Sequence, residues 1–274
     1  MGHGIAQVAA QTAKCEVNLR DVEQRFVDNG MKMIRESLQR FHSKGQISEA
    51  EVNETLKRLH PTLDLKEAVE NADLIIEAVP ENPEIKRTTY REVDKYAPPD
   101  ALIASNTSSI SITELASATS RAEKVCGMHF FNPPQLMKLI EIIRGARTSD
   151  ETIVTIQNVA QRMGKETVLV KKDVPGFIVN RILIPALNEA AALYWEGVAE
   201  RDDIDKAIKL GLNWPMGPLM LTDYIGADTT VAIAEVLTRE LDPKFHPSQG
   251  LKQMAKANLL GRKTGKGYYD WTQK

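Results

Sequence analysis

The sequence predicts an α/β domain followed by a smaller, all-helical domain. Short apolar runs of β type alternate with helical segments as far as residue 170, which is the rhythm of a parallel sheet covered on both faces. From residue 179 onward helical periodicity dominates. Pro175 and Gly176 mark the change. We therefore expect one domain over residues 1–172 and a second over residues 173–274.

The first domain is expected to begin with a helix and a strand. Residues 4–13 are small and apolar and predict a helix, and residues 16–20 predict a short strand that ends at Asp21. Residues 22–59 combine helical spacing with dense charge, which indicates a helical hairpin at the periphery of the sheet.

Further apolar runs predict the rest of the sheet. We expect strands at residues 74–79, 102–105, 125–129, 140–143 and 167–170, with a helix at 150–163 before the last of them. In the second domain we expect helices near residues 201–210 and 227–239. They follow one long apolar helix that carries Ile182, Leu183, Leu187, Ala190, Ala191 and Leu193.

The composition excludes several functional classes. The chain has 274 residues, 42% of them hydrophobic, and a net charge near −2 with scattered basic residues, which argues against a nucleic-acid surface. Cys15 and Cys126 have no CxxC spacing, so neither a metal cluster nor a disulfide framework is indicated. Because no apolar run reaches the roughly eighteen residues of a membrane span and no signal or transit pattern is seen, we expect a cytoplasmic protein.

One histidine has the neighbours that proton transfer requires. His129 lies twelve residues before Glu141 and twenty-one after Ser108. The three side chains can supply an acid/base, a carboxylate that orients it and a hydroxyl for the reacting oxygen. A carboxylate bonded to an imidazole fixes its tautomer, as removing a proton from an alcohol requires. The set favours alcohol–ketone redox chemistry.

The sequence around this histidine resembles the 3-hydroxyacyl-CoA dehydrogenase family. The resemblance covers essentially the whole chain, in the family's order and near its spacing. It is carried by segments 104–109, 129–133 (His-Phe-Phe-Asn-Pro), 137–141, 175–181, 215–218 and 263–268. It implies a Rossmann-type NAD-binding domain followed by a helical domain for substrate and dimerisation. It also implies the reversible NAD-dependent oxidation of (S)-3-hydroxyacyl-CoA to 3-oxoacyl-CoA, as in fatty acid β-oxidation.

The resemblance also implies a cofactor site. Gly2 matches the third glycine of the family's phosphate loop, and Asp21 matches the residue that binds the adenosine ribose, which favours NAD over NADP because a carboxylate repels a 2′-phosphate. Arg20, the residue before Asp21, could accommodate the 2′-phosphate of NADP and is the feature that argues against this preference. By this reading the first strand and two glycines lie upstream of Met1. The remaining cofactor positions implied are Glu81, Lys86, Asn106 and Asn132.

The same resemblance implies the roles of the reacting groups. His129 is the general base and, in reverse, the general acid, and Glu141 orients it. Ser108 and Asn180 hydrogen-bond the reacting oxygen. Ser37 and Lys44, on the expected helical hairpin, match positions that contact coenzyme A.

A homodimer formed mainly by the second domain is implied as well. One expected helix carries Leu183, Ile184, Leu187 and Leu193, more apolar surface than a domain of about one hundred residues readily covers. Two alternatives to the dehydrogenase stay open. One is a β-hydroxyacid dehydrogenase acting on a free acid, although that family generally relies on a catalytic lysine, and the other is a crystallin-like relative without turnover.

Overall fold

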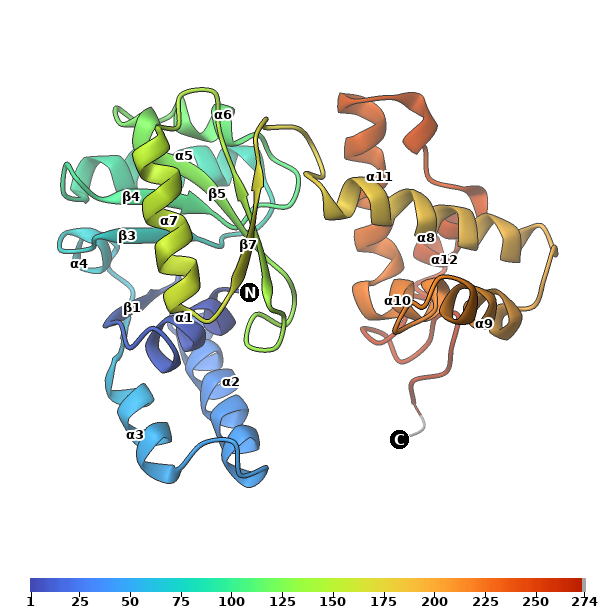
Figure 1. Cartoon of the computed structure of the whole chain (residues 1–274), viewed down its shortest axis with the longest axis horizontal. Helices are drawn as coiled ribbons and strands as arrows, with labels where there is room; N and C mark the ends of the chain where they lie inside the picture. The colour runs from blue at the N-terminus through green and yellow to red at the C-terminus, as the bar shows by residue number, and fades with distance from the viewer. Residues whose placement is uncertain (273–274) are drawn as a thin grey trace. The chain divides into compact units, whose positions relative to one another are not determined.

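The computed structural model describes residues 1–272 and divides the chain into two compact units, Met1–Asp173 and Val174–Lys274. Figure 1 shows strands and helices in the first unit and helices in the second. The predicted fold class, an α/β domain followed by a smaller helical one, is confirmed.

The larger sheet of the first unit has five strands. In spatial order they are β3 (Leu74–Glu77), β4 (Leu102–Ser105), β5 (Val125–Phe130), β6 (Leu139–Ile143) and β7 (Glu166–Val170). Strands β3, β4 and β5 are parallel, but β6 runs antiparallel to β5 and parallel to β7. The expected parallel sheet is therefore interrupted, because the short loop 131–138 cannot hold the crossover that a parallel neighbour needs.

A second, two-stranded sheet lies in the same unit. Its strands, β1 (Val17–Arg20) and β2 (Leu59–Thr62), are parallel. The sequence analysis did not predict β2. This strand contains Pro61, which has no N–H and is unusual in a strand interior. An edge strand of a small sheet tolerates that proline because the second side of the strand makes no ladder.

Helices cover both faces of the large sheet (Figure 1). Apolar side chains of α1 (Gly2–Gln11) and α7 (Asp150–Arg162) pack in one cluster with the strands, while α5 (Pro83–Tyr96) and α6 (Ile112–Ala116) lie on the other face. The side chains of Asn82 and Ser149 cap α5 and α7.

The peripheral hairpin consists of α2 (Gln24–Ser43) and α3 (Glu49–Lys57), joined by a turn at Gly45 and a capping box at Ser48. Its apolar face packs on α1 through Met31, Ile34 and Leu38. The short α4 (Leu65–Val69) and a 3₁₀ turn at Ala122–Lys124 complete the unit.

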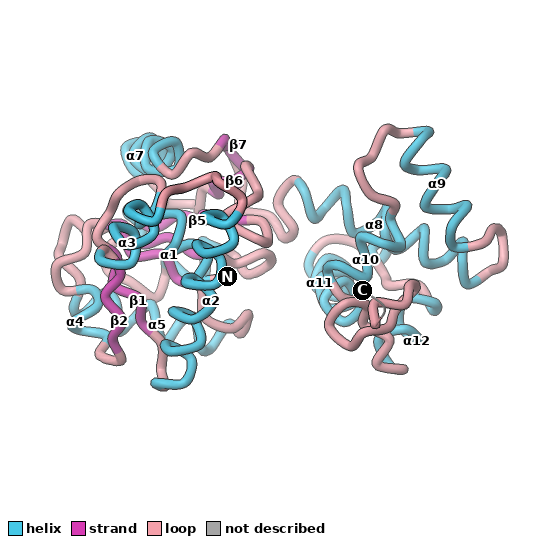
Figure 2. The backbone as a smooth tube through the Cα atoms, turned by 90° about the horizontal axis from the view of Figure 1, so that it is seen from below, coloured by secondary structure: helices cyan, strands magenta, loops and turns pink. Residues whose placement is uncertain are grey.

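The second unit is helical, as the cyan tubes of Figure 2 show. Its elements are α8 (Val179–Trp195), α9 (Arg201–Gly211), α10 (Pro218–Ile225), α11 (Ala227–Glu240), a 3₁₀ turn at Pro243–Phe245 and α12 (Gln249–Lys256). The sequence did not predict α10 and α12. Buried Asp223 fastens the last segment by accepting hydrogen bonds from the Tyr268 and Tyr269 amides and from Trp271 Nε1. No helix within residues 1–272 has the length and hydropathy needed to cross a membrane.

Candidate active site

The central feature of the first unit is a hydrogen-bonded pair of two facing strand residues. His129 on β5 stands directly opposite Glu141 on β6 in the antiparallel register, and opposite residues place their side chains on the same face. The His129 Nδ1 atom lies 2.7 Å from Glu141 Oε2. Both side chains are buried. A buried carboxylate needs such a partner, so the hairpin itself builds the pair.

The geometry orients the imidazole ring. With Nδ1 facing a carboxylate, a neutral His129 carries its proton on Nδ1 and keeps Nε2 as an acceptor. The Phe131 ring packs against it with centroids 4.7 Å apart and tilted by 53°. A ring fixed by a carboxylate on one nitrogen can accept a proton on the other.

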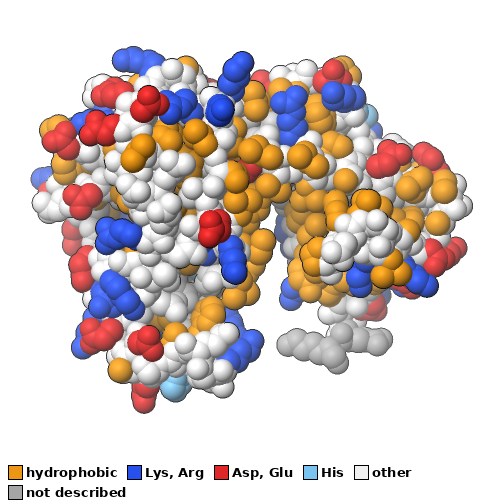
Figure 3. Space-filling view, in the orientation of Figure 1, with side chains coloured by type: hydrophobic (Ala, Val, Ile, Leu, Met, Phe, Trp, Pro, Cys, Tyr) orange, Lys and Arg blue, Asp and Glu red, His pale blue; other side chains and the backbone are white. Residues whose placement is uncertain are grey.

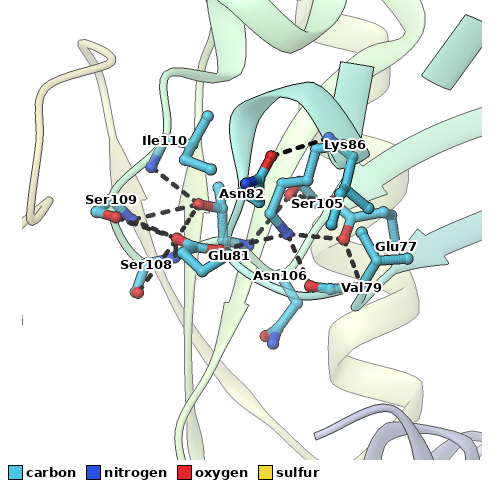
Figure 4. Close-up of polar contacts among 12 residues, drawn as sticks. Glu77, Val79, Glu81, Asn82, Lys86, Ser105, Asn106, Ser108, Ser109 and Ile110 are labelled. Carbon is cyan, nitrogen blue, oxygen red and sulfur yellow. Dashed lines mark hydrogen bonds and ion pairs between the residues drawn. The ribbon is translucent and has the colours of Figure 1, made fainter. Parts of the chain in front are cut away.

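Ser108 lies on the turn that follows β4. Ser105 of β4 pairs with Gly127 of the parallel strand β5, so Ser108 and His129 both stand at the carboxyl edge of neighbouring strands. Glu81 holds this turn by accepting hydrogen bonds from the backbone amides of Ser108 (3.0 Å) and Ser109 (3.1 Å) (Figure 4). The carboxyl edge of parallel strands is where α/β domains bind their ligands.

The Glu81 carboxyl is held ionised. Burial raises its pKa, but the charge of Lys86 and the hydrogen bonds from Thr107 and Ser108 together outweigh burial and bring the pKa below the ordinary value. An ionised carboxylate accepts several donors at once, as Glu81 does here.

Asn106 joins three strand ends. Its backbone amide donates to the Glu77 carbonyl at the end of β3, and its side-chain Oδ1 accepts from the Phe130 amide at the end of β5, both at 2.8 Å. The residue therefore fixes the spacing of the strands beside His129.

Lys86 and Glu77 form a second buried pair, which the sequence analysis missed. Lys86 Nζ lies 2.7 Å from Glu77 Oε1 and 3.3 Å from Glu81 Oε2. The signal was present in the sequence: a carboxylate closes the apolar strand Leu74–Glu77, where a charge requires a partner.

The N-terminus of α1 lies at the same edge of the sheet. A Cβ atom on Gly2 would meet Ala78, just after β3, at 3.7 Å, and one on Gly4 would lie 2.9 Å from Pro134, just after β5. Gly4 is thus required by close packing. Asp21 is exposed directly after β1, and its Oδ1 accepts from the Val22 amide. A helix N-terminus and a carboxylate in these places fit the pyrophosphate and ribose of NAD.

The remaining predicted site residues lie on several different elements. Asn132 is exposed in the loop between β5 and β6, and Lys44 is exposed at the end of α2. Ser37 is buried, and its Oγ accepts from Gln135 Nε2 at 3.3 Å. Asn180 belongs to the second unit, as the second residue of α8.

A sheet covered on both faces, with a helix N-terminus and an oriented histidine at its carboxyl edge, has the arrangement expected of an NAD-dependent oxidoreductase. The family model for the NAD binding domain of 3-hydroxyacyl-CoA dehydrogenase matches residues 1–174, and the model for the C-terminal domain of that enzyme matches residues 176–271. The chain belongs to the 3-hydroxyacyl-CoA dehydrogenase family, as its sequence predicted.

Individual relatives agree with this assignment. A probable 3-hydroxybutyryl-CoA dehydrogenase of Deinococcus radiodurans is 48% identical over 272 residues, which are 99% of this chain and 96% of the relative. A probable 3-hydroxybutyryl-CoA dehydrogenase of Bacillus subtilis is 45% identical over 275 residues, which are 100% of this chain and 95% of the relative. The crystal structure of (S)-3-hydroxybutyryl-CoA dehydrogenase PaaH1 from Ralstonia eutropha superposes with a TM-score of 0.94 at 42% identity, covering 100% of this chain and 96% of that chain.

Proposed function

We propose that this chain catalyses the reversible NAD-dependent oxidation of (S)-3-hydroxyacyl-CoA to 3-oxoacyl-CoA, with His129 as the general base. The observation that carries the proposal is the buried His129–Glu141 pair, whose 2.7 Å contact leaves Nε2 as the proton acceptor. The names of the relatives make 3-hydroxybutyryl-CoA the first substrate to test.

The proton moves through His129. Its Nε2 takes the hydroxyl proton of the substrate, and the imidazolium that forms is stabilised by Glu141. NAD, when bound, supplies the acceptor for the hydride that leaves the same carbon. In the reverse direction the imidazolium returns its proton to the ketone oxygen.

Ser108 and Asn180 complete the proposed site by hydrogen-bonding the reacting oxygen. The Ser108 hydroxyl stands on a turn held by Glu81, and Asn180 is the second residue of α8. Donors fixed in advance where charge develops lower the barrier without reorganising during the reaction.

The cofactor positions are proposed on the same basis. Asp21 accepts hydrogen bonds from the adenosine ribose and disfavours a 2′-phosphate, and Gly2 begins the helix whose N-terminus meets the pyrophosphate. We propose that four further residues bind the nicotinamide end of NAD. They are Glu81, Lys86, Asn106 and Asn132. Lys86 also contacts Glu81, since its Nζ lies 3.3 Å from Glu81 Oε2.

Coenzyme A is assigned to the end of α2. Lys44 is exposed there and suits a phosphate of the acyl carrier. Ser37 lies two helical turns earlier and is buried against Gln135, so Lys44 makes the contact and Ser37 supports it.

The residues proposed to form the homodimer contact in the second unit need to be corrected. Ile184 and Leu187, named above as apolar surface, are buried in the unit's own core. Hydrophobic side chains nevertheless gather on the face of this unit seen in Figure 3. The most exposed large apolar residues of the second unit are Leu210 (76%), Ile182 (68%), Val198 (64%) and Leu212 (62%). We propose that they meet a second copy of the chain. A cytoplasmic location stays a prediction.

The decisive experiment is turnover. The protein is mixed with NAD and (S)-3-hydroxyacyl-CoA substrates of C4 to C16, and NADH formation is followed. Oxidation of the CoA thioesters but not of the free 3-hydroxy acids supports the proposal. Oxidation of the free acids instead would favour the β-hydroxyacid reading, and tight NADH binding without any turnover would favour the crystallin-like one.

A further inference from the structure

A row of three side chains crosses the large sheet at the level of His129. The strand register pairs His129 of β5 with Glu141 of β6, and it pairs Glu141 with Val168 of β7. Side chains at paired positions point to the same face of a sheet. Val168 therefore shares a face with the proposed base and lies two strands away, about 10 Å by the usual spacing of strands.

The packing of the neighbouring residues shows which face this is. Met128, Ile142 and Leu169 form the adjacent row, and they pack in the cluster that joins the sheet to α1 and α7. Because successive residues of a strand alternate between the two faces, Val168 points away from that cluster. It therefore belongs to the face on which α5 and α6 lie.

Helix α6 covers only one end of that face. A Cβ atom on Gly127 would lie 3.0 Å from Ile112 of α6, and Gly127 pairs with Ile143, which pairs with Val170. In this covered row Val170 is 5% exposed, whereas Val168 in the row of His129 is 37% exposed. An apolar side chain is thus open beside the catalytic pair.

Two further apolar side chains adjoin the same row. Leu139 is half-buried at the start of β6, on the face of Glu141 and diagonal to Val168. Phe131, just after β5, packs its ring against His129. We call Phe131, Leu139 and Val168 the edge patch, since β7 is the outermost strand of this sheet.

The other directions from His129 are already assigned in the proposed function. NAD occupies the side of β3 and β4, beside Glu81 and Asn106, and coenzyme A runs to Lys44 at the end of α2. The acyl chain begins at the carbon next to the reacting one, so it must leave His129 along a third direction. Within the described part of the first unit, the edge patch offers an apolar surface on the side that these two ligands leave open.

We infer that the edge patch binds the acyl chain of the substrate beyond the reacting carbon, and that Val168 determines how well long chains are used. The inference rests on the proposed function, because it presumes a 3-hydroxyacyl-CoA substrate. An extended hydrocarbon chain advances about 1.3 Å per carbon. Crossing the roughly 10 Å from His129 to Val168 takes about eight carbons beyond the reacting carbon, so a C4 chain ends short of Val168 and a C12 chain contacts it.

The test compares kcat/KM for C4 and C12 (S)-3-hydroxyacyl-CoA in wild type, Val168→Asn and Val168→Ile. Asparagine is polar but neutral, so it leaves the charge near Glu141 unchanged. We expect Val168→Asn to lower kcat/KM for C12 by about tenfold, because each buried methylene contributes about fourfold in affinity. Values for C4, NADH affinity and melting temperature should stay within about twofold or a few degrees of wild type, since the side chain is exposed. Val168→Ile should keep C12 turnover.

Val154→Asn is the matched control, since Val154 is an exposed valine of α7, and it should leave both substrates unaffected. An unchanged ratio of C12 to C4 in Val168→Asn would overturn the inference, whether both values fall together or neither falls. So would a wild type that oxidises C4 but not C12, or a Val168→Asn variant that changes only the sedimentation of the protein. A wild type that oxidises no CoA thioester at all rejects the proposed function instead.

Discussion

His129 and Glu141 occupy directly opposed positions of β5 and β6, with Nδ1 and Oε2 2.7 Å apart. The eight-residue loop between the strands turns a separation of twelve residues in sequence into a cross-strand contact. Because both residues belong to one hairpin, the acid/base and the carboxylate that orients it are fixed together.

Replacing His129 with glutamine should abolish most turnover while leaving NADH binding nearly unchanged. Glutamine keeps a polar side chain but cannot take up the substrate proton, and general acid–base catalysis contributes about 10²–10⁴-fold. Steady-state kcat and NADH titration check this. The control is His60→Gln, since His60 is an exposed histidine of β2. A near-wild-type kcat in His129→Gln would refute the assignment of the base.

Replacing Glu141 with glutamine should lower kcat by at least about tenfold. The amide can donate to Nδ1 of His129 and so favour the tautomer with the proton on Nε2, and it cannot stabilise the imidazolium. Glu166→Gln, an exposed residue of β7, is the control. A Glu141→Gln variant in which only KM rises would make Glu141 a binding residue instead.

The contribution of Glu81 to stability should depend on pH in acid. The charge of Lys86 and hydrogen bonds from Thr107 and Ser108 outweigh the effect of burial and hold the Glu81 pKa below its ordinary value of 4.5. A depressed carboxyl pKa stabilises the fold above the unfolded pKa, and the effect is lost as pH falls through the folded pKa. The difference in melting temperature between wild type and Glu81→Gln should therefore shrink below pH 4.5. A difference that stays constant down to acid unfolding would contradict this.

Replacing Lys165 with methionine should loosen the loop that carries Asn132. The buried Lys165 Nζ donates to the carbonyls of Pro134 (2.6 Å) and Met137 (2.8 Å), and burial lowers its pKa. Loss of two hydrogen bonds from a charged donor, partly offset by relief of desolvation, should lower the free energy of unfolding by about 1–3 kcal/mol. Urea unfolding measures this, and Lys138→Met, exposed in the same loop, should change it little. Equal effects of the two substitutions would show that the loop does not depend on Lys165.

The second unit should form the homodimer through its exposed apolar residues. Wild-type protein should sediment at twice the 30.5 kDa of one chain, and Leu210→Asp or Ile182→Asp should shift it toward the monomer because a carboxylate cannot be buried unpaired. Val154→Asp, at an exposed position of α7, is the control. A wild-type protein that sediments as a 30.5 kDa species at micromolar concentration would refute the dimer.

The sequence by itself determined the fold class, most strands and the identity of the family. These features depend on local order: apolar runs such as Leu102–Ser105 form strands, and the segment around His129 keeps its residue types and spacing. Periodicity along the chain is set by neighbours two to four residues away, so one sequence is enough to detect it.

The tertiary structure alone decided the pairings. The antiparallel direction of β6, the contact of Lys86 with Glu77 and the burial of Ile184 in the unit's own core depend on which elements become neighbours and in which register. Residues far apart in sequence meet only when strands and helices pack, and local periodicity does not record that choice. The same reason explains why Glu77, an ordinary strand residue by sequence, becomes the centre of a buried network only in the folded chain.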